Sequence, residues 1–222
     1  AIGIGATYGG LPRASDGRPG QLGINNKSDV RLLMNNLRQA RADYRMLSLH
    51  RGYEKIIRVN GSEISNIRNA MLEQGNIDLL IGHHAHVTRG IEMNNGRLVF
   101  YGLGNFLHPG TANMASKGRC KDYSILARVH LVREGQGKPK LAAVEVVPIT
   151  ETHKRPRPMK PRQAAKRVAI LNGLARQFDN PARGAKGVRF SIRGDGTGLY
   201  CTPAATTNET TSSLCLDYDE GR

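Results

Sequence analysis

The chain has 222 residues, of which 39% are hydrophobic and 5% aromatic, and it contains no tryptophan. This length and apolar content suit one substantial α/β domain and exclude a chain that is disordered throughout. The formal net charge is +15, and no run of about 18 apolar residues occurs, so the sequence predicts no transmembrane helix.

The first predicted elements are a strand and a helix. Residues 1–7 lack an initiator methionine and have the pattern of an internal strand, so we expect a chain that is truncated at its N-terminus. Ser28 and Asp29 then cap a predicted helix that continues to Ala40, with an apolar stripe suited to packing on a sheet. Both elements are assigned to a domain that spans residues 1–150.

A strand, a helix and a second strand follow. Residues 44–50 form a predicted strand that ends in His50, and residues 77–82 form a buried strand that runs into His83. Residues 62–75 between them have the spacing of a capped helix with Gly75 as its stop. Parallel strands joined by a helix place their carboxyl ends at one sheet edge, so we expect the two histidine segments to converge.

Converging histidines are typical of a metal site. Neutral imidazole binds Zn, Fe, Ni and Cu, and alternate residues of an extended segment, such as His84 and His86, project to the same side. We therefore predict that His50, His84 and His86 are metal ligands, while His83 could take the place of His84. The alternative is a set of hydrogen-bonded loop histidines. A run of three histidines after a buried strand favours the metal, which would account for the imidazole nitrogens that it engages.

The next segments predict antiparallel strands. Asn-Gly between apolar runs in residues 90–100 indicates a β-hairpin, and residues 123–132 and 141–147 continue as strands. Asn105 follows another strand end. It either caps its own turn or orients groups near the metal, and we treat it as a candidate substrate-binding residue.

Positive charge is densest in residues 153–162, where prolines keep the chain extended. This segment is either a solvated linker, which we favour, or a strip that binds a polyanion. Nucleic acid is an unfavoured partner, because no aromatic residues alternate with the basic ones to stack on bases. The segment opens a region, residues 151–200, that we interpret as a basic linker and a helical appendage, with its helix over residues 163–178.

The last region, residues 201–222, is a polar tail that we expect to be loosely ordered. The three cysteines lack the short paired spacing of a zinc module. Cys120 is isolated, whereas Cys201 and Cys215 either form a disulfide or remain free thiols.

Three blocks, residues 48–54, 81–87 and 96–106, resemble in order and spacing the bacterial CapA family of poly-γ-glutamate capsule synthesis proteins. That family has the calcineurin-like metallophosphoesterase fold, so the resemblance implies an α/β (α+β) β-sandwich flanked by helices. Arg51, Ala85 and Gly102 depart from the family's usual residues without removing a ligand. The upstream Asp and Asn-His blocks of two-metal phosphoesterases have no counterpart before His50, so we expect a fold that is incomplete at its N-terminus.

The resemblance implies a role in capsule biosynthesis, with divalent Mn, Fe or Zn as cofactors. With the N-terminal half present, the site would be that of a metal-dependent phosphoesterase-like hydrolase. It further implies an anionic polymer or a phosphate-containing substrate, a membrane-bound capsule-synthesis complex as partner, and an exported or envelope-associated location. The alternative is a non-catalytic polyanion-binding or assembly factor on the same fold.

Overall fold

The strand-helix-strand unit predicted around His50 lies at the centre of the larger sheet in the computed structural model, which describes residues 2–7, 14–15, 17–110, 112–216 and 218. β3 (Arg45–His50) and β4 (Leu79–His83) pair in parallel. They are joined by α2 (Gly61–Asn66), which continues into a π-helix, η1 (Ile67–Glu73). In register, His50 lies opposite His83, so the two strands end at the same sheet edge as predicted.

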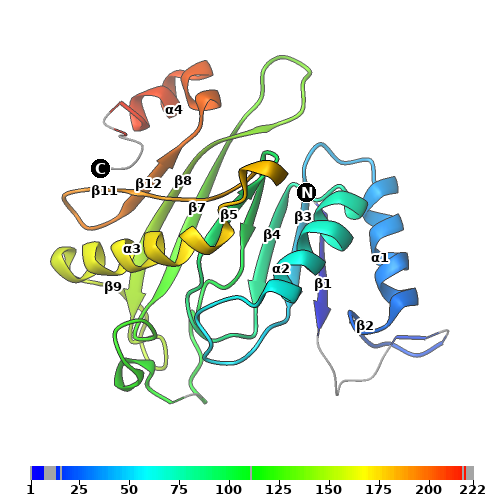
Figure 1. Cartoon of the computed structure of the whole chain (residues 1–222), viewed down its shortest axis with the longest axis horizontal. Coiled ribbons are helices and arrows are strands. Elements are labelled where there is room, and N and C mark those ends of the chain that lie inside the picture. The colour runs from blue at the N-terminus through cyan, green and yellow to red at the C-terminus, as the bar shows by residue number, and fades with distance from the viewer. Residues whose placement is uncertain (1, 8–13, 16, 111, 217, 219–222) are drawn as a thin grey trace.

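The larger sheet has the strand order β10-β5-β6-β4-β3-β1-β2 (Figure 1). Its other strands are β1 (Ile2–Thr7), β2 (Leu22–Gly23), β5 (Ile91–Asn94), β6 (Arg97–Phe100) and β10 (Ala185–Gly187). β1, β2, β3, β4 and β6 run parallel, whereas β5 forms the predicted hairpin with β6. Asn95 and Gly96 have positive φ angles of 48° and 78°, the conformation that a tight Asn-Gly hairpin turn requires.

One face of this sheet is covered by α1 (Lys27–Gln39) and α2. The predicted helix is present, but Asn26 rather than Ser28 or Asp29 is its N-cap: the Asn26 side chain accepts the backbone N–H groups of Ser28 and Asp29 at 2.9 and 3.3 Å. The Asp29 carboxylate instead accepts the N–H of Gly23 at 2.9 Å. Leu33 and Leu37 of α1 are buried against the core, as the apolar stripe predicted.

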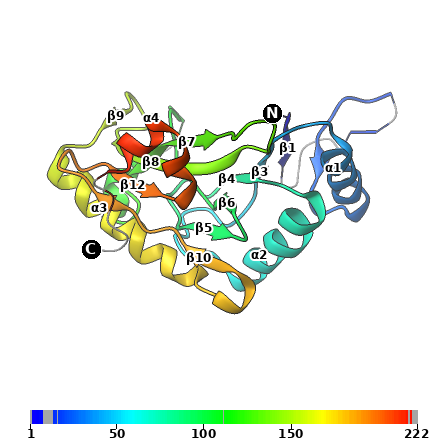
Figure 2. The same cartoon turned by 90° about the horizontal axis from the view of Figure 1, so that it is seen from above.

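The other face packs against a second, antiparallel sheet with the order β11-β12-β8-β7, so the expected α+β sandwich of two sheets flanked by helices is confirmed (Figure 2). Its strands are β7 (Ser124–Val132), β8 (Lys140–Thr150), β9 (Arg157–Pro158), which pairs with β8, β11 (Ser191–Ile192) and β12 (Gly198–Cys201). The core between the sheets includes Leu98 and Phe100 from the first sheet and Val144 and Val146 from the second. The strands predicted over residues 123–132 and 141–147 are therefore present.

The region from residue 151 onward contributes to both layers. α3 (Pro161–Ala175) corresponds to the helix predicted over residues 163–178 and buries Val168 and Leu171 in the core between the sheets. After it, β10 joins the first sheet, while β11 and β12 join the second. The short helical turns of the chain are η2 (Met114–Lys117), η3 (Arg176–Phe178), η4 (Pro181–Arg183) and η5 (Pro203–Thr207).

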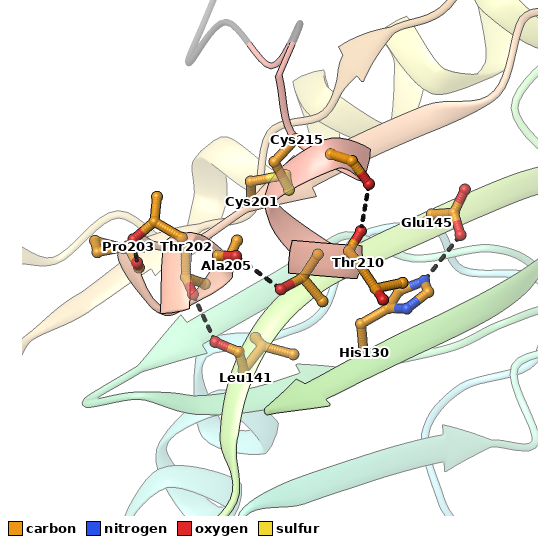
Figure 3. Close-up of a disulfide and its surroundings, with 12 residues drawn as sticks. His130, Leu141, Glu145, Cys201, Thr202, Pro203, Ala205, Thr210 and Cys215 are labelled. Atoms are coloured by element: carbon orange, nitrogen blue, oxygen red, sulfur yellow. Dashed lines mark hydrogen bonds and ion pairs between the residues drawn. A yellow bond between two sulfur atoms is a disulfide. The ribbon is translucent and has the colours of Figure 1, made fainter. Parts of the chain in front are cut away.

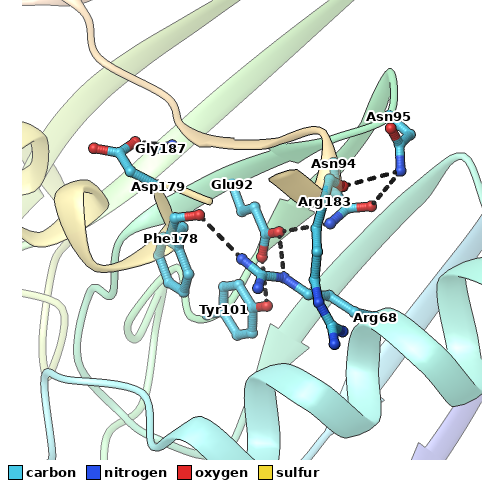
Figure 4. Close-up of polar contacts among 9 residues, drawn as sticks. All are labelled: Arg68, Glu92, Asn94, Asn95, Tyr101, Phe178, Asp179, Arg183 and Gly187. Carbon is cyan, nitrogen blue, oxygen red and sulfur yellow. Dashed lines mark hydrogen bonds and ion pairs between the residues drawn. The ribbon is translucent and has the colours of Figure 1, made fainter. Parts of the chain in front are cut away.

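A buried polar cluster joins this later region to the first sheet (Figure 4). Glu92 on β5 is fully buried and accepts hydrogen bonds from Arg68, Asn94 and Tyr101 at 2.8, 3.0 and 2.7 Å. Arg68 also donates to the carbonyl oxygen of Phe178 at 3.0 Å. Since these groups come from η1, from β5, from the residue directly after β6 and from η3, the cluster fixes the chain after α3 against the sheet that carries the histidines.

The segment between Cys201 and Cys215 is folded onto the second sheet by a disulfide with a Cα–Cα distance of 6.2 Å (Figure 3). This segment contains η5 and α4 (Glu209–Leu214). The Thr211 hydroxyl donates to the carbonyl oxygen of Ala205 at 2.7 Å, and the Thr202 hydroxyl donates to that of Leu141. The disulfide and these side-chain bonds explain why residues 202–214 are ordered, where the Thr, Ala and Ser content predicted a loose tail. Cys120 is a free cysteine.

Within the described part of the chain, no helix is both long and apolar enough to cross a lipid bilayer.

Candidate functional site

The histidines gather at the sheet edge where β3 and β4 end. There, His50 and the chain segments 82–87 and 102–108 line a cavity of about 320 Å³. The first segment follows β4 and the second follows β6, so adjacent parallel strands deliver all three parts of the wall. The convergence predicted from the strand ends is therefore present.

The closest contact between two histidines of the cavity joins His50 and His84. His84 Nδ1 lies 3.0 Å from His50 Nε2, and the ring centroids are 4.8 Å apart. One ring donates its N–H to the other, so the accepting ring is neutral and its lone pair points at the donor ring. Of the two neighbouring histidines that the sequence could not distinguish, His84 is the one that faces His50.

The backbone that presents His84 and His86 is not extended, as the sequence pattern suggested, but twice enters the left-handed region. The φ angles of these residues are 82° and 57°. Between and after them, Ala85 and Val87 are buried in a small apolar cluster with Met114. Because the small apolar residues are anchored inward, both imidazoles face the cavity, and their ring centroids are 6.4 Å apart. Left-handed conformations are costly for non-glycine residues and are concentrated at functional sites.

Asn105 holds the third imidazole. Its Oδ1 accepts the Nδ1–H of His86 at 2.7 Å, which leaves the lone pair of that ring on Nε2. The Nδ2 atom of Asn105 is buried and has no hydrogen-bond partner among the described residues. Asn105 is thus more than a turn cap, because its side chain reaches into the histidine cluster. His108 also lines the cavity, with its ring centroid 5.2 Å from that of His86.

His83 lies on the same strand end but has a different partner. Its Nε2 is 3.0 Å from the Ser48 hydroxyl, and the residue is exposed. Ser48 and His50 lie on the same face of β3. His83 therefore packs on the face that carries His50, but its hydrogen bond goes to Ser48 and not to the His50 ring. It offers a neutral nitrogen at the rim of the cavity.

The electrostatics of the cluster favour neutral rings. Burial, together with the neighbouring imidazoles of His84, His83 and His86, holds the pKa of His50 below its usual value. Burial likewise lowers the pKa of His83. Neutral imidazole is the form that binds a metal, so the lowered pKa values of His50 and His83 favour the metal-binding form of these two rings.

A buried ion pair that the sequence reasoning missed supports the loop after His50. Arg89 is fully buried: it donates to Glu63 at 3.1 Å and to the carbonyl oxygens of Tyr53 and Ile56 at 2.8 and 2.9 Å. Gly52 has a φ of 126°, and a Cβ there would lie 2.6 Å from an Arg89 nitrogen. Burial raises the pKa of Glu63, although Arg89 opposes the shift. A single charged residue in the segment Val87-Thr88-Arg89-Gly90-Ile91 was the available signal.

The chemistry of the donor set fits a divalent transition metal in part. Two nitrogens bound to one ion at about 2.1 Å lie about 3 Å apart when the bonds are at right angles, and this matches the His50–His84 pair. Among the described residues, however, no three His, Cys, Asp or Glu side chains already surround one point. The described residues therefore provide two nitrogens, those of His50 and His84, that are close enough to share one ion. The His86 ring lines the same cavity, with its centroid 6.4 Å from that of His84.

Comparison with known proteins places this cluster in a family. A protein-family model described as "Bacterial capsule synthesis protein PGA_cap" matches residues 8–109. This part of the chain matches the PGA_cap family. The segment contains every site residue named above, whereas α3 and the disulfide lie outside it.

The PGA_cap segment is also similar to a curated relative, the PGA biosynthesis protein CapA of Bacillus subtilis (strain 168). The two are 34% identical over 110 residues, which cover 50% of this chain and 26% of the relative. The chain thus spans about a quarter of that relative's length. The family resemblance inferred from the three histidine-bearing and Asn105-bearing blocks is confirmed.

Proposed function

We propose that the chain takes part in making or handling a capsule polymer of the poly-γ-glutamate type, through a divalent metal held by His50, His84 and His86. The observation that carries the proposal is the 3.0 Å contact between His50 and His84 at the joint end of two parallel strands. The similarity to a PGA biosynthesis protein supports the choice of polymer. Mn, Fe and Zn all accept imidazole ligands, so each remains a candidate cofactor.

In this proposal the three histidines have different roles. His50 and His84 would supply the first two nitrogens, and the ring that now donates would carry its proton on its other nitrogen instead. His86 supplies the third through Nε2, because Asn105 already occupies its Nδ1. His83 stays at the rim with Ser48. A bound ion would polarise a phosphoryl oxygen and lower the pKa of a bound water, which is the chemistry of a phosphoesterase-like hydrolase.

Asn105 is proposed to act on both the metal ligand and the substrate. Its Oδ1 orients His86, while the buried Nδ2 has no acceptor among the described residues. A buried donor of this kind is typically satisfied by a bound group, and an oxygen of a phosphate-containing or carboxylate substrate is a suitable acceptor. A membrane-bound capsule-synthesis complex remains the proposed partner.

Metal retention tests the first part of the proposal. The purified chain, incubated with Zn²⁺ or Mn²⁺ and then desalted, should retain metal in elemental analysis, because neutral imidazoles on a preformed scaffold bind such ions. His84→Ala should lower the affinity at least tenfold. His83→Ala is the matched control and should change it less than threefold, since His83 faces Ser48. Equal losses in the two variants, or no retained metal in the parent chain, would contradict the ligand assignment.

Asn105→Ala gives a second, independent result. Removing the acceptor of the His86 Nδ1–H frees that ring to rotate, and loss of such an outer partner typically weakens metal binding by about 10–100-fold. Asn105→Asp keeps an acceptor oxygen and should restore most of the affinity. The measurement is a competitive metal titration against a chromophoric chelator. If Asn105→Ala binds metal as the parent chain does, Asn105 acts on a turn and not on His86.

A non-catalytic polyanion-binding or assembly factor is the second candidate. It is favoured by one observation: the described residues hold only a two-nitrogen half-site without a third ligand in place. Hydrolysis of a generic aryl phosphate by metal-loaded protein, with His86→Ala as control, separates the two. Turnover that His86→Ala abolishes supports the hydrolase, and identical background rates support the binding factor.

A further inference from the structure

A groove lined by α1, by Asn66 at the end of α2 and by Gln74 after η1 differs from the histidine cavity in its charge. It has a volume of about 470 Å³ and is lined by four basic side chains, those of Lys27, Arg31, Arg38 and Arg51. Its described lining includes no acidic residue. None of the four forms an ion pair with a carboxylate of the described residues. The groove is therefore a concentration of positive charge.

The basic groups are spread along the groove and do not converge on one point. Lys27, Arg31 and Arg38 lie on one stripe of α1, and at about 1.5 Å per residue the first and last are separated by about 16 Å along the helix axis. Arg38 donates to the carbonyl oxygen of Gln74 at 3.0 and 2.6 Å, which ties α1 to the end of η1. A row of separated cations matches a linear ligand with regularly spaced single charges better than a compact anion.

The rest of the lining is not charged. Ile24 and Met34 are buried at its base, with Val30 half-buried beside them. Asn35 and Asn66 present carboxamide groups from the two facing helices. Cations would pair with carboxylates, carboxamides would bond to amide links, and the apolar base would contact methylene groups. A γ-linked glutamate chain carries a carboxylate, an amide link and methylene groups in every repeat. An inorganic polyphosphate has no methylene groups that could pack on the apolar base.

The groove leads toward the histidines. Arg51, which lines the groove, is the residue directly after His50, which lines the histidine cavity. α1 and α2 cover the same face of the first sheet (Figure 2). Arg51 of the groove belongs to the loop after His50 that Arg89 anchors through the carbonyl oxygen of Tyr53. A polymer lying in the groove would thus reach the strand end that carries the site.

We propose that the groove of Lys27, Arg31, Arg38 and Arg51 is a binding track for a linear γ-linked polycarboxylate that guides the chain to the histidine cavity. The choice of polymer rests on the proposed function, but the track itself needs neither a metal nor turnover. Binding measured in the presence of a chelator therefore tests the track alone. Loss of the metal site would leave this binding unchanged.

The experiment is a fluorescence-anisotropy titration of a labelled γ-glutamate decamer with the full chain in EDTA, repeated over a range of salt concentrations. Lys27→Glu/Arg31→Glu should weaken binding at least tenfold, since both side chains are exposed and make no described ion pair. The matched control is Lys154→Glu/Arg155→Glu in the basic segment, which changes the net charge equally at exposed positions and should stay within twofold. Thermal unfolding of both variants verifies that they fold.

Four results would overturn the proposal. Equal weakening in the two charge-reversal variants would mean that the decamer responds to net charge alone. Selective weakening in the control variant would place the track on residues 153–162. A polyphosphate of equal charge that competes as well as the decamer would show a general polyanion groove without selectivity for carboxylates. Decamer binding that survives Lys27→Glu/Arg31→Glu in a folded variant would likewise remove the track.

Discussion

Replacing Arg89 with methionine is expected to lower the free energy of unfolding by about 3–5 kcal/mol, because breaking a buried ion pair leaves the remaining charge uncompensated. Arg89 has no exposed surface and bonds to Glu63, Tyr53 and Ile56. Methionine fills much of the volume but satisfies none of these groups. Denaturant-induced unfolding, followed by circular dichroism, measures the loss.

Arg128→Met is the control for Arg89→Met. Arg128 is 74% exposed and pairs with Glu145 at 3.6 Å, so its replacement should cost less than about 1 kcal/mol. The double variant Arg89→Met/Glu63→Leu should be more stable than Arg89→Met, since it removes both buried charges. A loss in Arg89→Met no larger than in Arg128→Met would mean that the ion pair does not anchor the loop after His50.

Glu92→Leu is expected to cost a similar amount, about 3–5 kcal/mol, because it deprives a buried guanidinium of its carboxylate. Glu92 is fully buried and accepts three hydrogen bonds, including the 2.7 Å bond from the Tyr101 hydroxyl (Figure 4). Leucine leaves Arg68, Asn94 and Tyr101 without this acceptor. The effect should extend to η3, because Arg68 also holds the carbonyl of Phe178 and the Phe178 ring stacks on Tyr101 at 4.5 Å.

Hydrogen exchange measured residue by residue shows whether the Glu92 cluster joins the two parts of the chain. In Glu92→Leu, protection should fall in both β5 and residues 176–187. Glu134→Leu, which removes an exposed ion pair with Lys140, should alter neither segment. If only β5 loses protection, the later region is held by apolar packing and not by this cluster.

The elements that depend on local periodicity could be predicted from the sequence. The short apolar runs around β3 and β4 and the Asn95-Gly96 turn each determine their element within a few residues. The N-cap of α1 was wrong by two to three positions, because Asn26, Ser28 and Asp29 are all good caps and Asp29 is instead bonded to Gly23. Competing caps within one turn are resolved only by tertiary contacts.

The candidate site could be predicted in position but not in detail. Strand ends brought His50 and His84 together, whereas the choice between His83 and His84 depended on the left-handed backbone at residues 84 and 86. The supporting pair of Glu63 and Arg89 is 26 residues apart in the sequence, and no local pattern encodes it. The pairing of β10 with the first sheet, and of β11 and β12 with the second, likewise joins residues far apart in the sequence. These short, glycine-rich strands have no local pattern that predicts the pairing.

Anomalous diffraction at the zinc edge, from crystals of the chain grown with Zn²⁺, tests the central claim that imidazoles from separate strands share one cation. The account predicts a single strong peak about 2.0–2.1 Å from one nitrogen of His50 and one of His84, with His86 turned toward it. The contradicting result is density with no peak there and the two rings still hydrogen-bonded to each other, or a peak bound elsewhere, such as at His130 and Glu145.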